Sequence, residues 1–149
     1  MRPPEQLAAD ARGAFERVHR EVFLGDPVAN SRLVVDIVDA GLVADTSVLV
    51  LVAPWTVNGL LFPPDGDFPD VLELAGRRRR VFCSWLPGLG AFHSVNLPVE
   101  ATTVHDMRQA RILARSWVVP LHEAVRAARA GRRRTAEGAR HIAEGSKQR

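Results

Sequence analysis

Residues 47–69 read SVLVLVAPWTVNGLLFPPDGDFP, and this stretch decides the fold. Its first part, Ser47 to Ala53, is so uniformly apolar that we predict a strand covered on both faces, at the centre of a sheet. Pro54 ends this strand, because proline has no N–H to donate to a neighbouring strand. The apolar run resumes from Val57 to Phe62 and predicts a second strand, which the turn-forming residues 63–67 close.

The N-terminal region predicts one helix and one strand. From Leu7 to Leu24, apolar residues recur every three or four positions, which places them on one face of a helix. Gly25-Asp26-Pro27 stops this helix. Asn30 leads into the β-branched run from Leu33 to Val38, which we predict to be the first strand. After the deciding stretch, residues 70–75 are predicted to form a short turn or helix.

A hairpin is predicted in the second half of the chain. Arg79 to Leu86 and Ala91 to Leu97 read as strands and flank Pro87-Gly88-Leu89-Gly90. The two glycines of this connection can take the positive φ that a tight turn needs.

The C-terminal region predicts helices followed by a loss of apolar content. Thr103 is a candidate cap for a helix that continues to Val118. Pro120 is expected to kink or restart this helix, and Leu121 to Ala130 form its second piece. Residues 131–149 hold too few apolar side chains to offset the entropy of ordering, so we predict a disordered basic tail.

The order of helix, hairpin-linked strands and helix predicts an α+β fold. We expect one domain over residues 1–130, with an antiparallel sheet of about five strands packed by N- and C-terminal helices. A chain of 149 residues with 46% hydrophobic residues can form one such core.

Charge and composition argue against several classes of protein. The net charge is +3, but residues 132–149 hold six basic and two acidic residues, so the first 131 residues carry −1. A nucleic-acid-binding domain usually concentrates positive charge on one face of its fold. The longest apolar stretch is far shorter than the roughly 20 residues that cross a bilayer, and the N-terminus lacks the apolar region of a secretion signal. We therefore expect a cytoplasmic protein.

Metal and cofactor binding are not expected either. Cys83 is the single cysteine, so the chain has no intramolecular disulfide and no Cys-x-x-Cys metal motif. The histidines lie far apart, without the spacing of a helical metal pair; they are His19, His93, His105, His122 and His141. No glycine-rich phosphate loop is present, since Gly88-Leu89-Gly90 joins two strands.

Catalytic residue types occur, but not in a convincing arrangement. Ser94 lies beside His93, with Asp106 downstream, yet neighbours in a strand point to opposite faces. Cys83 lies in an apolar strand, where a packed and unreactive thiol is the usual outcome. We predict no enzyme activity. The alternative is a small-ligand-binding or hydrolytic α+β domain that uses Cys83, His93 and Ser94.

Two further features have both a structural and a binding interpretation. Arg77 to Arg80 are internal and so are not an export signal; we expect a solvated turn that enters a strand, or else a charged rim for an acidic partner. Trp55 and Phe62 are either core aromatics or, because Trp55 follows a strand-ending proline, the mark of an apolar groove or edge where another polypeptide lies.

Three groups of residues resemble a known family. Pro54, Trp55, Asn58 and Pro63 match the order T-P-W-x-x-N-x-x-x-x-P. Upstream, residues 30–35 are similar to Asn-Pro-x-Leu-x-Val; downstream, residues 93–99 align with Cys-Ser-Leu-x-Ser-Pro-Met, with histidine in place of the cysteine. These patterns resemble the HybE-type assembly chaperones of NiFe hydrogenases, a family that includes the HupJ and HoxT proteins. The resemblance covers residues 10–119 in outline.

The resemblance implies a non-enzymatic chaperone that binds hydrogenase subunits. Its main partner would be the small-subunit precursor with its twin-arginine signal, with the large subunit as a further partner, and it would delay export until cofactor loading and subunit pairing are complete. The implied fold is similar to that of secretion chaperones, with one layer of helices on an antiparallel sheet. Independently of the resemblance, a flat apolar sheet edge would permit a homodimer. We predict that partner-binding residues lie at strand ends: Pro54, Trp55, Asn58, Phe62, Pro63, His93, Ser94 and Pro98.

A nucleic-acid binder with a basic tail is the third hypothesis.

Overall fold

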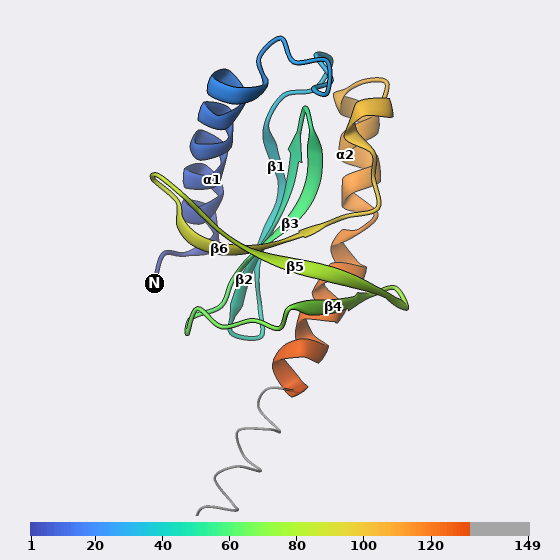
Figure 1. Ribbon diagram of the computed structural model, residues 1–149. Helices are drawn as coiled ribbons and strands as arrows, with labels where there is room; N and C mark the ends of the chain where they lie inside the picture. The colour runs from blue at the N-terminus through green and yellow to red at the C-terminus, as the bar shows by residue number, and fades with distance from the viewer. Residues whose placement is uncertain (132–149) are drawn as a thin grey trace, which may run out of the picture.

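The computed structural model describes residues 1–131, which have an α+β fold with a six-stranded antiparallel sheet (Figure 1). In chain order the elements are α1 (Pro4–Val18), the π-helix η1 (His19–Phe23), β1 (Asp36–Val43), β2 (Thr46–Ala53), β3 (Thr56–Phe62), β4 (Val71–Leu74), β5 (Arg77–Leu86), β6 (Gly90–Asn96), the 3-10 helix η2 (Ala101–Thr103) and α2 (Met107–Arg115). A last helix spans residues 118–131. The strand order is β1-β2-β3-β6-β5-β4. The predicted α+β class is confirmed, with six strands in place of about five.

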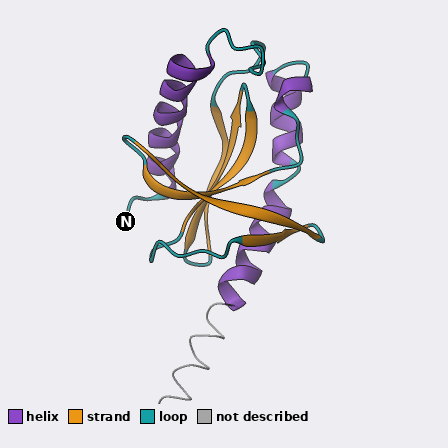
Figure 2. Ribbon diagram, in the orientation of Figure 1, coloured by secondary structure: helices purple, strands orange, loops and turns teal. Residues whose placement is uncertain are grey.

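Helices cover both faces of β2, and all eight of its residues are buried. Its even-numbered hydrophobic residues pack in one core cluster with α2 and residues 118–131, while its odd-numbered ones pack in a second cluster with α1. Figure 2 shows α1 and α2 on opposite sides of these strands. The predicted burial of both faces is confirmed. However, β2 lies second from the edge of the sheet, and one helix layer lies on each side of it rather than a single layer on one side.

Tight turns join neighbouring strands. Pro54 and Trp55 form the two-residue turn between β2 and β3, which confirms the predicted strand, break and strand. The hairpin of β5 and β6 is also confirmed, and Gly88 and Gly90 in its turn have φ of 80° and 87°.

The first strand begins later than predicted, at Asp36 rather than Leu33. The reason is a turn in the preceding residues, in which the Leu33 N–H donates to the Asn30 carbonyl at 3.0 Å. The Asn30 side chain also accepts from the Arg32 N–H at 3.0 Å, so these residues cannot join the β1 ladder.

The prediction of a turn or helix at residues 70–75 is wrong, because most of this segment is strand β4. Its two leucines alternate into the core, as the two-residue period of a strand requires. Ala75 and Gly76 have φ of 49° and 78°, so they reverse the chain and pair β4 with β5. As a consequence, Arg77 to Arg80 form the first half of β5 rather than a turn.

The C-terminal region forms two helices, and the cap of the first and the break between them lie near the predicted positions. Asp106, not Thr103, caps α2: its carboxylate accepts from the Gln109 N–H at 2.8 Å. The chain turns after Arg115, and a new helix begins at residue 118 with Pro120 in its first turn, so the predicted restart is confirmed. No helix within residues 1–131 is long and apolar enough to cross a membrane. The predicted basic tail, apart from Gly131, lies outside the described residues.

Candidate functional site

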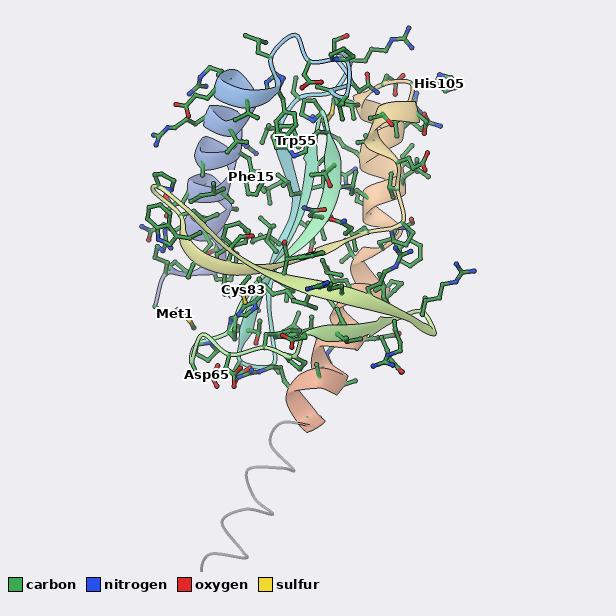
Figure 3. All side chains as sticks on the ribbon, viewed as in Figure 1. Met1, Phe15, Trp55, Asp65, Cys83 and His105 are labelled. Carbon is green, nitrogen blue, oxygen red and sulfur yellow. The ribbon has the colours of Figure 1, made fainter. Side chains whose placement is uncertain are left out.

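Trp55 lies at one end of the sheet within a stack of aromatic rings. Its ring is nearly parallel to the rings of Phe23 and His19, with centroids 4.3 Å and 6.1 Å away, and Phe15 lies at 6.3 Å. We call these four residues the aromatic ledge; Figure 3 labels two of them, Phe15 and Trp55. Trp55 is half-buried, so it packs on the core and also offers ring surface to solvent.

The ledge forms because one helical stretch repeats an aromatic ring every fourth residue. Residues four apart lie on the same face of a helix, and Phe15, His19 and Phe23 have this spacing. The π-helix η1 carries the last two rings beyond the end of α1. Such helical turns are rare and are often found at functional sites. The ring spacing was present in the sequence, but its partner across the fold was not visible there.

An exposed apolar segment borders the ledge. Val22, Leu24, Val28 and Val34 are all more than half exposed, and Leu24 reaches 70%. Single exposed hydrophobic residues are common on proteins, but several in one short segment indicate a surface that binds something. We call residues 22–34 the apolar segment.

Asn30 holds the apolar segment against the ledge. Its N–H donates to the Pro54 carbonyl at 2.7 Å, next to Trp55. Its side-chain amide donates to the carbonyls of Ala101 and Val104 at 2.9 Å and 2.7 Å, which connects the segment to the chain leading into α2. The family pattern that begins at Asn30 therefore has a structural reason: the backbone N–H and the side-chain amide of one residue connect three parts of the fold.

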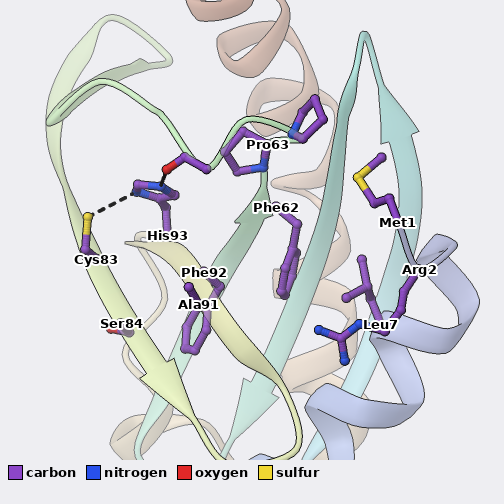
Figure 4. A pocket seen from close by; sticks show the side chains of 12 residues that line it. Met1, Arg2, Leu7, Phe62, Pro63, Cys83, Ser84, Ala91, Phe92 and His93 are labelled. Carbon is purple, nitrogen blue, oxygen red and sulfur yellow. Dashed lines mark hydrogen bonds between the residues drawn. The ribbon is translucent and has the colours of Figure 1, made fainter.

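A second candidate site lies around Cys83 and His93, which face each other on β5 and β6 (Figure 4). The His93 ring donates from Nε2 to the Gly66 carbonyl at 3.1 Å, since a carbonyl can only accept. Nδ1 is then free to accept from the Cys83 thiol, whose sulfur is 3.4 Å away. The two side chains line an open pocket of about 530 Å³ together with Phe62 and Phe92.

The structure corrects the expectation of a packed cysteine, because Cys83 is exposed. The side chains from Phe82 to Trp85 are exposed on both faces of β5, and no helix within residues 1–131 buries them. Ser94 does not line the pocket. Asp106 caps α2, next to His105 at the far end of the molecule from Cys83 in Figure 3. The residue types of a hydrolytic triad are therefore not brought together.

The predicted partner-binding residues divide between the two ends of β3. Pro54 and Trp55 precede the strand and Phe62 and Pro63 end it, and seven residues at about 3.3 Å each separate the two groups by roughly 20 Å. His93 belongs to the second group. Four of the eight are buried, three are half-buried and one is exposed; in this order they are Pro54, Phe62, Pro63 and His93, then Trp55, Asn58 and Ser94, then Pro98.

Arg129 is the structural residue that sequence reasoning missed. It is 4% exposed and forms two parallel bonds to the Asp45 carboxylate, 2.8 Å from Nε and 2.7 Å from the terminal nitrogen. This hydrogen bonding lowers the pKa of Asp45 from its ordinary 3.8 to about 2. Arg129 also donates to the Asp67 carbonyl at 2.9 Å, and so fixes the loop whose Gly66 orients His93. In sequence it is one arginine among several on a helix, with nothing to distinguish it.

The fold and the site define a small α+β protein that presents apolar and aromatic surface at the end of a sheet. Residues 6–142 match the family described as NiFe-hydrogenase assembly, chaperone, HybE. The chain therefore belongs to the HybE family of NiFe-hydrogenase assembly chaperones, and the resemblance found in the sequence is confirmed. No curated protein and no solved structure matches the chain.

Proposed function

We propose that this chaperone binds the hydrogenase small-subunit precursor in the cytoplasm and delays its export. It would release the twin-arginine signal once cofactor loading and subunit pairing with the large subunit are complete. It would act by binding alone, without catalysis and without a cofactor of its own.

The observation that carries this proposal is the apolar segment beside the aromatic ledge. A twin-arginine signal continues from its arginine pair into an apolar stretch, which must be kept from water and from other apolar surfaces until export. Leu24 and Val28 are exposed at the place where such a stretch would be covered, and Trp55 adds a flat ring beside them.

The predicted partner-binding residues take two roles in this proposal. Trp55, Asn58 and Pro98 have side-chain surface to offer and belong to the end of β3 next to the ledge; the Leu97 N–H donates to Val57 at 3.0 Å and so places Pro98 there. The buried Pro54 supports the turn rather than contacting a partner itself. Phe62, Pro63, His93 and Ser94 form the other end, which we propose to contact a different part of the subunit.

A pair of matched double variants tests the proposal. Leu24→Ser with Val28→Ser removes apolar surface from the segment, and Leu42→Ser with Val119→Ser removes the same residue types at similarly exposed positions elsewhere. Binding to purified precursor, with and without its signal sequence, is measured by calorimetry. Covering an exposed leucine or valine contributes about 1.5 kcal/mol or more, so we expect the first pair to weaken binding to the full precursor at least about tenfold.

The second pair should bind the full precursor like the natural chain, and the precursor without its signal should bind weakly to all variants. Equal binding of the precursor with and without its signal would show that the signal is not the bound element. Equal loss in both double variants would show that the segment has no special role.

The pocket at Cys83 and His93 supports a second candidate function, small-ligand binding. The observation is its volume of about 530 Å³, within the range of small-molecule sites, and its partly aromatic walls. Protection of the Cys83 thiol from iodoacetamide by a bound ligand is the test. The pocket is not a ligand site if two results are found together. No compound in a fragment collection slows alkylation of Cys83 in the folded chain, and none binds more than weakly by calorimetry.

A further inference from the structure

The second half of β5 has one side open to another strand. β4 pairs only with the first four residues of β5, Arg77 to Arg80, whereas β6 pairs with Val81 to Leu86 on the opposite side. The last bond on the β4 side runs from the Val81 N–H to the Asp70 carbonyl at 2.8 Å. Within residues 1–131, no strand continues along that side. Figure 1 shows β5 running on past the end of β4.

This open edge, Phe82 to Leu86, presents backbone groups for pairing. The backbone N–H and C=O groups of successive residues point alternately to the two sides of a strand, and the N–H of Val81 points toward β4. Cys83 and Trp85, two and four residues further on, therefore point their N–H and C=O groups outward. Proteins usually block such an edge with charges, proline or a covering loop, because it is a template for another strand.

The open edge carries large exposed apolar side chains rather than the charges or proline that would block another strand. Trp85 is 66% exposed and Phe82 43% exposed, on opposite faces of the strand. A strand added along the edge would have one large apolar neighbour on each face. Peptides that bind by strand addition gain affinity from main-chain hydrogen bonds and specificity from contacts with alternate side chains, and this edge offers both.

Positive charge lies where the open edge meets β4. An open groove of about 630 Å³ is lined by Arg78, Arg79 and Arg80 with a single carboxylate, that of Asp70. None of the arginines from Arg77 to Arg80 forms an ion pair within the described part of the chain. Arg80 instead lies over the Phe82 ring, 5.4 Å from its centroid. Unpaired guanidinium groups beside a vacant strand position favour a ligand that brings carboxylates.

We propose that the open edge of β5 binds an extended segment of a partner protein that has alternating apolar residues followed by acidic ones. The apolar part pairs with Phe82 to Leu86 by strand addition, and the carboxylates lie over the groove at Arg78 and Arg80. Every strand pair in this sheet is antiparallel, so the acidic residues come at the C-terminal end of the bound segment.

This surface is separate from the one proposed for the signal sequence. The β5–β6 turn contacts Arg2, just before the start of α1, whereas the ledge is built at the other end of that helix. Its charge repels a twin-arginine motif, so it would recognise a different segment.

The test uses the full chain and a fluorescein-labelled peptide of alternating valine and threonine that ends in three aspartates. Binding is followed by fluorescence polarisation. We expect saturable binding that weakens at high ionic strength, and at least about tenfold weaker binding when lysines replace the aspartates. A peptide with the same side chains but N-methylated at alternate amides should bind at least about tenfold more weakly, because it cannot complete the strand pairing.

Two variants locate the site. Arg78→Glu with Arg80→Glu should weaken binding at least about tenfold, while the matched Arg115→Glu with Arg126→Glu, on exposed helix positions, should not change it. Trp85→Pro removes an outward N–H without removing a bond to β6, and should also abolish binding.

Three results would overturn the proposal. If the N-methylated peptide binds with the same affinity as the parent peptide, strand addition is ruled out. If the lysine peptide binds with the same affinity as the parent peptide, an acidic ligand is ruled out. Sedimentation could also show a dimer of the free chain that Trp85→Pro converts to a monomer, which would make a second copy the occupant of the edge. These measurements involve no hydrogenase subunit, so their failure is distinct from a failure of the signal-binding proposal.

Discussion

Replacing Trp55 with alanine separates its two roles, packing on the core and contacting a partner. The substitution removes the indole from the ring stack, where it lies 4.3 Å from Phe23 at an interplanar angle of 10°. It leaves the turn intact, because Pro54 and the backbone bond from Asn30 remain.

The two expected effects are similar in size but differ in their consequence. Removing a fully buried tryptophan costs about 3–5 kcal/mol; Trp55 is half-buried, so we expect the free energy of unfolding to fall by about 2 kcal/mol. A domain of this kind is stable by about 5–15 kcal/mol and would stay folded. Truncating an aromatic anchor of an interface costs about 2 kcal/mol or more, or about 30-fold in the dissociation constant.

The assay compares Trp55→Ala with Trp117→Ala. Trp117 is also half-buried, but packs against the other core cluster, on the α2 side of the sheet. Free energies of unfolding are measured by urea titration with circular dichroism, and dissociation constants for the precursor are measured under folding conditions. We expect both variants to lose a similar amount of stability and only Trp55→Ala to lose binding.

If the two variants bind the precursor equally well and lose only free energy of unfolding, a contact role for Trp55 is refuted. The ledge would then be core packing at the end of the sheet. Trp55→Phe provides a further check, since it keeps a ring on Phe23 but removes the outer part of the indole surface; it should restore stability more fully than binding.

Three further predictions concern the frame that holds these surfaces. The folded-state pKa of Asp45 is lowered to about 2, so the bond to Arg129 stabilises the fold at every pH above the ordinary 3.8 and is lost as the pH falls through about 2. A double-mutant cycle of Arg129→Met and Asp45→Asn should give a coupling of about 1–2 kcal/mol at neutral pH, discounted for partial exposure; a coupling that stays constant into strong acid would contradict this assignment. Gly59→Ala should cost about 1–3 kcal/mol in urea titration, because its Cβ would lie 2.8 Å from a leucine of the last helix, whereas Gly41→Ala meets nothing within 4 Å; equal stability of the two variants would show that the helix adjusts freely. Asn30→Ala removes three side-chain bonds and should cost about 1–3 kcal/mol and expose the apolar segment to limited proteolysis, and unchanged cleavage would mean that the segment is held by other contacts.

Local signals were sufficient where a short stretch determines its own conformation. The apolar run ending at Pro54 predicted β2 and its burial, and the glycines around Leu89 predicted the β5–β6 hairpin. The turn at Ala75 and Gly76 was missed because alanine rarely takes positive φ, so no turn residue marked its first position. Strand β4 was missed with it.

The sequence by itself determined the class of fold, the Pro54–Trp55 turn and membership of the HybE family. These depend on backbone preferences, apolar periodicity and residue order, all of which are local. Only the tertiary structure decided that Trp55 stacks on a π-helix, that Cys83 faces His93 and that half of β5 has an open edge. Each of these depends on which strands pair, in which register and how far, and pairing between distant residues is set by the packing of the whole domain.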